Sequence, residues 1–162
     1  MGGNTNAQKP PTPDPSPHGG GEPPNTRTQI TMTPELTTLA LAALLLAAQF
    51  VPFSILANRD LTPGYTSSPR DRPPSRQMST LTGRLQRALN NHFESLILFT
   101  IAVVVVTLGN QSTPVTQYAA YTYLAARILY VPAYALGWRP WRSVIWMVGF
   151  AATFTMIIAS LI

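Results

Sequence analysis

The chain has 162 residues, of which 46% are apolar and only 10% are charged, whereas soluble domains usually carry about a quarter charged residues, so this composition argues against a soluble enzyme. Its net charge of +5 comes mostly from arginines beside apolar runs and not from a clustered basic surface, and we therefore expect no nucleic-acid partner. The absence of cysteine and the presence of only two histidines exclude a disulfide and a cysteine nucleophile and predict no metal site.

Residues 1–31 form the polar front of the chain. They are rich in proline and glycine and have almost no apolar side chains. Such a segment cannot bury enough apolar surface to offset the entropy lost on ordering, so we expect a disordered tail. The membrane pattern begins directly after Met32, and our hypothesis is that Met32 is the physiological start. Residues 32–162 are then one membrane domain.

Four long segments of this domain have the length and composition of membrane-spanning helices, for which about 20 apolar residues suffice. The second segment is longer than a membrane requires, and its first half is polar, so that half must face protein, water or ligand. We expect a kink in the third segment at Pro132. We expect an all-α membrane protein, a bundle of four transmembrane helices at residues 36–57, 79–108, 115–136 and 142–162.

The connections between these segments differ in charge. The loop 58–78 contains four arginines, and the turn 137–141 contains Arg139, while the turn 109–116 carries no charge. Short basic connections tend to stay in the cytoplasm. The protein should therefore be multi-pass, with loops 58–78 and 137–141 cytoplasmic and both termini on the opposite side. An interfacial aromatic belt is expected at Trp138, Trp141 and Trp146.

Two polar stripes follow from helical periodicity. The second segment presents Arg84, Arg87, Asn91 and Glu94, and the third presents Tyr123, Arg127, Tyr130 and Tyr134. Glu94 and Arg127 should lie at similar depth, where a lone charge costs at least about 2.5 to 3.5 kcal/mol, so we expect them to form an ion pair.

The arginines outnumber the carboxylate in this predicted cleft, which favours an anionic ligand, and the tyrosine hydroxyls add further donors. The alternative is that these polar residues only hold the helices together. His92 lies off the arginine face, and we interpret it as a structural or lipid-interface residue.

Two sequence segments resemble the MAPEG family, which includes the microsomal glutathione transferases. They are RLQRALNNHFE, with the pattern R-x-x-x-N-x-x-E at Arg87, Asn91 and Glu94, and YLAARILYVPAYALGWRPWRS. The resemblance extends over residues 32–162 and is to bacterial-type members, which implies the bacterial inner membrane. It also implies a homotrimer that binds glutathione, as co-substrate, between neighbouring subunits on the cytoplasmic side.

Individual site residues are likewise implied by the resemblance. Arg142 would stabilise the glutathione thiolate, with help from Ser143, and the thiolate is the nucleophile. The turn before Arg142 is one residue shorter than in part of the family, so Arg139 competes for this role. The tripeptide itself would be bound by Arg87, Asn91, Glu94, Arg127, Tyr130 and Tyr134.

Three functions fit these observations. The leading one is a glutathione-dependent transferase or peroxidase that acts on small lipophilic electrophiles from the lipid bilayer. The second is a non-catalytic binding or structural protein of the same fold. The third is a small four-helix exporter, but such exporters place their acidic residue in the first helix, and residues 36–57 carry no charge.

Overall fold

The computed structural model describes residues 1–3 and 32–162. The predicted tail therefore falls almost wholly outside the described residues, and so does the segment on which the hypothesis of a start at Met32 depends. Within the described residues all regular secondary structure is helical. The helices are α1 (Pro34–Leu61), α2 (Pro63–Thr66), α3 (Thr80–Leu108), α4 (Pro114–Leu136) and α5 (Trp141–Ala159).

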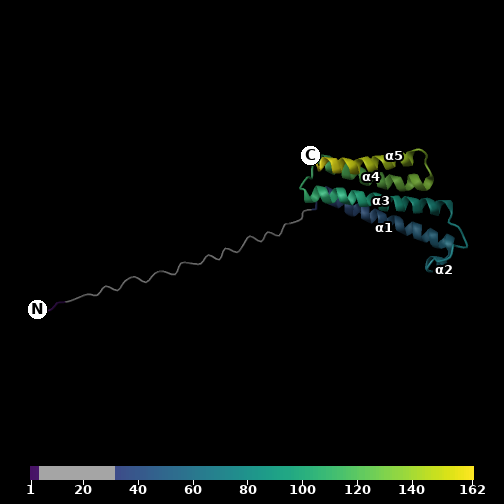
Figure 1. Cartoon of the computed structure of the whole chain (residues 1–162), viewed down its shortest axis with the longest axis horizontal. Helices are drawn as coiled ribbons and strands as arrows, with labels where there is room; N and C mark the ends of the chain where they lie inside the picture. Colours follow the sequence, from purple (N-terminus) through teal and green to yellow (C-terminus); the bar gives the residue numbers. More distant parts are fainter. Residues whose placement is uncertain (4–31) are drawn as a thin grey trace. The chain divides into compact units, whose positions relative to one another are not determined.

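The four long helices lie side by side and alternate in direction, as Figure 1 shows. Helix α4 packs along α5, and α1 packs against α3 and α4, while α3 contacts all three of the others. This alternation brings the α1–α3 and α4–α5 connections to one end, here called the basic end because both carry arginines. The α3–α4 turn lies at the other end.

The predicted segments agree closely with the helices, although α2, a single turn in the basic loop, was not foreseen. Three of the long helices, α1, α3 and α5, are long and apolar enough to span a membrane. Helix α4 has 23 residues, which is sufficient length, but Arg127 and its tyrosines make it more polar. The all-helical membrane class is thus confirmed, while a membrane-spanning α4 stays a prediction.

Local sequence signals explain where the helices begin. The hydroxyls of Thr33, Ser79 and Thr113 accept hydrogen bonds from the backbone N–H three residues ahead, at the starts of α1, α3 and α4. Such caps satisfy N–H groups that have no partner within the helix. At α4 the side chain of Thr116 also accepts from the backbone N–H of Thr113, which completes a capping box.

The interior divides into an apolar half and a polar half. The apolar half lies toward the α3–α4 turn, where small side chains pack around Phe99 and Tyr123, whose rings stack with centroids 3.8 Å apart. Small residues let helix backbones approach closely when no water drives the packing. The polar half lies toward the basic end and contains the predicted stripes except for Tyr123, which belongs to the apolar half.

Two carboxylates hold α1 at its ends. The fully buried Glu35 accepts hydrogen bonds from the hydroxyls of Ser112, at 3.0 Å, and Thr116, at 2.6 Å. At the basic end Asp60 accepts from the backbone N–H of Ser79 and the hydroxyl of Thr82. These bonds fix α1 relative to the α3–α4 turn and to the start of α3.

The end of α4 depends on a contact between Gly137 and Arg84. Gly137 adopts the left-handed conformation that ends many helices, with φ of 73°. The Arg84 guanidinium lies over it and donates a hydrogen bond of 3.2 Å to the carbonyl of Ala135. We expected Arg84 to add free positive charge to the cleft, but the structure instead shows it binding the end of α4, where carbonyls lack partners.

We predict that Gly137→Ala destabilises the protein by about 1–3 kcal/mol, because a side chain is strained at positive φ. The added Cβ would also lie 2.9 Å from Cζ of Arg84. Chemical unfolding of the detergent-solubilised protein measures the loss. Gly64→Ala is the matched control, since a Cβ at Gly64 meets nothing within 4 Å. Equal stability of the two variants would contradict the prediction.

Candidate functional site

The polar half contains two adjoining pockets between α3, α4 and α5. The outer pocket, nearer the basic end, has a volume of about 250 Å³ and is lined by Asn91, Tyr130, Tyr134, Arg142, Ser143 and Trp146. The inner pocket has a volume of about 160 Å³ and is lined by Asn91, Glu94, Ser95, Leu98, Arg127, Trp146, Phe150 and Thr153. Because Asn91 and Trp146 line both, the two pockets adjoin, and together they are the candidate site.

The structure brings most of the predicted site residues together here. Those that line the two pockets are Asn91, Glu94, Arg127, Tyr130, Tyr134, Arg142 and Ser143. Arg87 lies outside both pockets, but its guanidinium carbon is 5.9 Å from the centre of the Tyr134 ring. Residues from three helices thus converge in one region of the polar half.

Arg127 is the central residue of the site. Its side chain is only 2% exposed, and Nη1 donates a hydrogen bond of 3.0 Å to Oδ1 of Asn91. The guanidinium also lies near the rings of Tyr123 and Tyr130, with centroid distances of 5.1 and 5.7 Å. Aromatic faces attract cations, and this attraction is stronger out of water. The Nε–H group of Arg127 has no partner among the described residues.

The expected ion pair between Glu94 and Arg127 is not formed in the single subunit. Arg127 bonds to Asn91 instead, one helical turn nearer the basic end of α3, and Glu94 is exposed. The amide of Asn91 and the rings of Tyr123 and Tyr130 offset the cost of burying the charged guanidinium of Arg127. No carboxylate within residues 32–162 takes part. Both residues nevertheless line the inner pocket, so the Glu94 carboxylate remains available to a ligand there.

Tyr134 connects the cations at the basic end. Its ring lies 5.0 Å from the guanidinium carbon of Arg142 and packs edge to face with Tyr130 at 5.4 Å. Arg142 is half-buried, whereas the competing Arg139 is exposed and lines neither pocket. This geometry favours Arg142 over Arg139 as the cation that faces the outer pocket.

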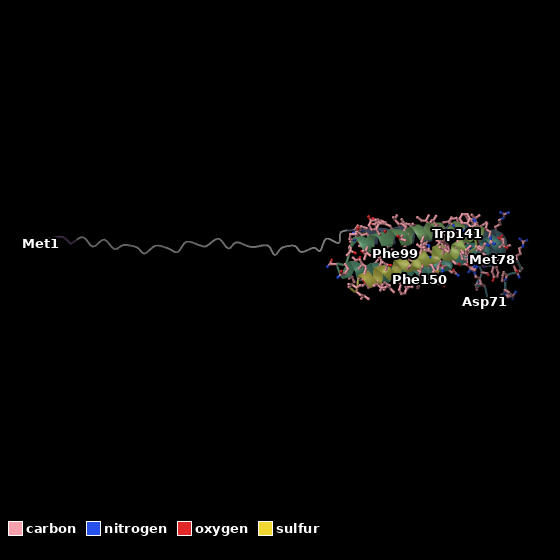
Figure 2. The ribbon with its side chains drawn as sticks, turned by 90° about the horizontal axis from the view of Figure 1, so that it is seen from above. Met1, Asp71, Met78, Phe99, Trp141 and Phe150 are labelled. Atoms are coloured by element: carbon pink, nitrogen blue, oxygen red, sulfur yellow. The ribbon has the colours of Figure 1, made fainter. Side chains whose placement is uncertain are left out.

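Two aromatic side chains of the site were not identified from the sequence. Trp146 was expected in an interfacial belt together with Trp138 and Trp141, but it is half-buried and forms a wall of both pockets. Phe150, labelled on α5 in Figure 2, lines the inner pocket. Their positions four and eight residues after Arg142, on the same face of the helix, were the signal that could have found them.

His92 has a structural position. It is 1% exposed, and its Nδ1 lies 2.7 Å from Nε2 of Gln49, a hydrogen bond that connects α3 to α1. The structural interpretation therefore agrees with the contacts, and a position at the lipid interface is wrong. Gln49 explains this burial, because a polar residue in the apolar α1 provides the partner that a buried imidazole requires.

A larger pocket, of about 990 Å³, lies between the second half of α1, the basic loop and the start of α3. It contains Arg87 and Arg70 but none of the other predicted site residues. The smaller pockets are the better candidate site, because they combine guanidinium groups, phenol hydroxyls and a carboxylate. That combination can bind a small molecule that carries both carboxylates and an ammonium group.

Comparison with known proteins adds a family match. The model of the MAPEG family matches residues 35–162, which include both pockets and nearly all of the four long helices. No curated protein and no solved structure matches the chain.

We predict that Asn91→Ala lowers the free energy of unfolding by about 1–3 kcal/mol, because Arg127 then loses a hydrogen-bond acceptor in a buried site. In an Arg127→Met background the same change should cost less, with a coupling energy of at least about 1 kcal/mol. Unfolding in detergent by a denaturant titration measures the cycle.

Glu94→Gln in the same two backgrounds is the control. Without an ion pair in the subunit its effect should be additive with that of Arg127→Met within about 0.5 kcal/mol. If the coupling energy between Glu94 and Arg127 is larger than that between Asn91 and Arg127, the prediction is contradicted. The ion pair expected from the sequence would then be supported.

Proposed function

The chain belongs to the MAPEG family, and from this membership we propose that it is a membrane-bound, glutathione-dependent transferase or peroxidase that acts on lipophilic electrophiles. The observation that carries the proposal is the convergence of Arg127, Arg142 and Glu94 with two tyrosines around two adjoining pockets. A scaffold would not require that set of charges in the polar half of a membrane protein.

The charges of the site suit glutathione. The tripeptide carries two carboxylates and one ammonium group, so it needs cations and an anion at fixed separation. Arg127 supplies a guanidinium group that pairs well with a carboxylate, and Glu94 supplies the partner for the ammonium. Tyr130, Tyr134 and Asn91 add neutral hydrogen-bonding groups, and Arg87 adds a further cation behind Tyr134. The donor set therefore fits this co-substrate.

Arg142 is the proposed partner of the glutathione sulfur. A guanidinium beside a thiol favours the thiolate, and the N-terminus of α5 adds a partial positive charge. In a transferase reaction the thiol proton leaves to water and the sulfur forms a bond to the electrophilic carbon. The leaving group then departs with the electron pair of its former bond. Ser143, beside Arg142 in the outer pocket, can donate a hydrogen bond to the sulfur.

In the peroxidase form of the reaction, two glutathione molecules are oxidised to their disulfide. The hydroperoxide is reduced to an alcohol and water. The same stabilised thiolate would attack the peroxide oxygen, so Arg142 and Ser143 have the same roles in both reactions.

Glu94 supports the proposed homotrimer. It lies about 20 Å along α3 from Thr80, and its side chain is exposed on the single subunit. A carboxylate in contact with lipid at that depth would cost about 2.5–3.5 kcal/mol or more. An interface between subunits, with glutathione bound in it, would remove Glu94 from lipid.

The same proposal includes the membrane arrangement. All four long helices would span the bilayer, with the arginine-rich connections 58–78 and 137–141 in the cytoplasm and the termini opposite. The site would then open toward the cytoplasm, where glutathione is present, and apolar substrates would reach it from the lipid. The basic charge of these connections supports this orientation.

The alternative is a non-catalytic membrane protein that keeps the family fold. Calorimetric titration of the detergent-purified protein with glutathione and with its S-alkyl conjugates separates the two. The enzyme should bind both, and an absence of binding at millimolar ligand would favour the alternative.

We predict that Arg142→Ala lowers turnover about a hundredfold, which corresponds to about 2.7 kcal/mol of lost transition-state stabilisation. Its affinity for glutathione should change only a few fold, because the tripeptide is bound mainly by Arg127, Glu94 and Asn91. Steady-state kinetics and calorimetry measure the two effects. The ultraviolet absorbance of the bound thiolate near neutral pH should decrease in parallel.

Arg139→Ala is the matched control, since Arg139 is exposed and lies outside both pockets. Its turnover should stay near that of the unmodified protein. If Arg139→Ala loses turnover and Arg142→Ala does not, the catalytic role belongs to Arg139. If neither variant loses turnover, both arginines serve only the orientation of the protein in the membrane.

A further inference from the structure

The aromatic residues of α5 beyond Trp141 gather on one face of the helix. Trp146, Phe150 and Phe154 follow one another at intervals of four residues, and Arg142 precedes them at the same interval. Successive rings are in contact, with centroids 5.0 Å apart between Trp146 and Phe150 and 4.6 Å apart between Phe150 and Phe154. We call these three residues the aromatic ladder.

The ladder is continuous with the candidate site. Trp146 lines both pockets, Phe150 lines the inner pocket, and Phe154 lies one turn beyond. Arg142 and the aromatic ladder together extend over about 18 Å along α5. Phe150 and Phe154 are 37% and 44% exposed. A molecule that moves along this face from the apolar part of the protein arrives at Arg142 and Ser143.

The rest of α5 makes this face distinctive. Its other exposed large side chains between Trp141 and Ala159 are aliphatic, namely Val144, Met147, Val148 and Ile158. Lipid chains pack equally well against aliphatic and aromatic side chains, so contact with lipid does not explain why all three rings share the face that leads to the pockets. Aromatic rings do favour other rings, which they contact in offset or edge-to-face geometry.

We propose that the aromatic ladder selects electrophiles that contain a flat aromatic ring over linear aliphatic ones. This inference rests on the proposed function, because it names the substrate class of the same site. A ring held against Trp146 brings its electrophilic carbon beside Arg142, where the glutathione sulfur is expected. Each favourable ring contact should contribute about threefold to tenfold to the preference.

The kinetic test compares two electrophiles in the full-length, detergent-purified protein. 1-Chloro-2,4-dinitrobenzene provides a flat ring, and trans-2-nonenal provides a linear chain that accepts the thiolate by addition. Phe154→Leu and Phe150→Leu keep apolar bulk but remove a ring. We expect kcat/KM for the aryl chloride to fall about threefold to tenfold in each, while in Phe154→Leu that for nonenal changes less than twofold. In Phe154→Leu the KM for glutathione should stay constant, because Phe154 lines neither pocket.

Phe93→Leu is the matched control, because Phe93 is a 51% exposed ring on α3 that lines neither pocket. It should leave the ratio of the two substrates unchanged. Equal losses for both substrates in the ladder variants, or no loss for either, would overturn the proposal. A change of oligomeric state in Phe154→Leu, seen by gel filtration, would instead assign the face to a second copy of the chain.

A binding measurement keeps this test separate from the proposed catalysis. Calorimetry with S-(2,4-dinitrophenyl)glutathione and S-hexylglutathione should show tighter binding of the aryl conjugate, and Phe150→Leu should remove this preference. If the protein binds the aryl conjugate more tightly than the hexyl conjugate but shows no turnover, the proposed enzymatic function is wrong. The proposed selectivity of the aromatic ladder is then still supported. If glutathione and the aryl conjugate bind but the hexyl conjugate binds equally well, the ladder fails and the proposed function stands.

Discussion

The position of a single buried cation determines how α3, α4 and α5 fit together. Arg127 is out of contact with solvent, so its guanidinium needs partners inside the protein. Asn91 on α3 supplies a hydrogen bond, and the rings of Tyr123 and Tyr130 supply aromatic faces. Helix α5 leaves room for it at Gly149, where a Cβ would lie 3.3 Å from Nη2 of Arg127. The three helices therefore meet at one relative height, and the two pockets form around that point.

The sequence contains enough information to predict the helices and the region where their polar side chains meet. Hydroxyl caps at Thr33, Ser79 and Thr113 mark helix starts, and the length of the apolar runs indicates membrane spans. The polar stripes predicted correctly that α3 and α4 present their polar residues to a common region. These features depend on neighbours within one helix, and helical periodicity reports such neighbours directly.

The contacts between side chains on different helices could not be predicted in the same way. Asn91 and Glu94 are three residues apart on one face of α3, and periodicity does not distinguish which of them reaches Arg127. Charge favoured Glu94, whereas the contact distance in the structure favours Asn91. The binding of Arg84 to the end of α4 was likewise hidden, because it depends on a turn 51 residues away in sequence. The position of Trp146 in the site could not be predicted, because most of α5 is apolar. Hydrophobic periodicity therefore does not distinguish its pocket-lining face from the others.

The spacing of residues within α5 determines which side chains share the face that lines the pockets. Arg142 lies in the first turn of α5, which begins at Trp141, and Trp146 follows one turn later. One residue inserted between Arg142 and Trp146 would turn Arg142 by about 100° relative to the rings beyond it. Arg142 and Trp146 would then no longer line the same pocket, although each side chain would be chemically intact. For this reason Val144 and Ile145 should tolerate substitution more readily than insertion, and the number of residues in this turn is itself part of the specification of the site.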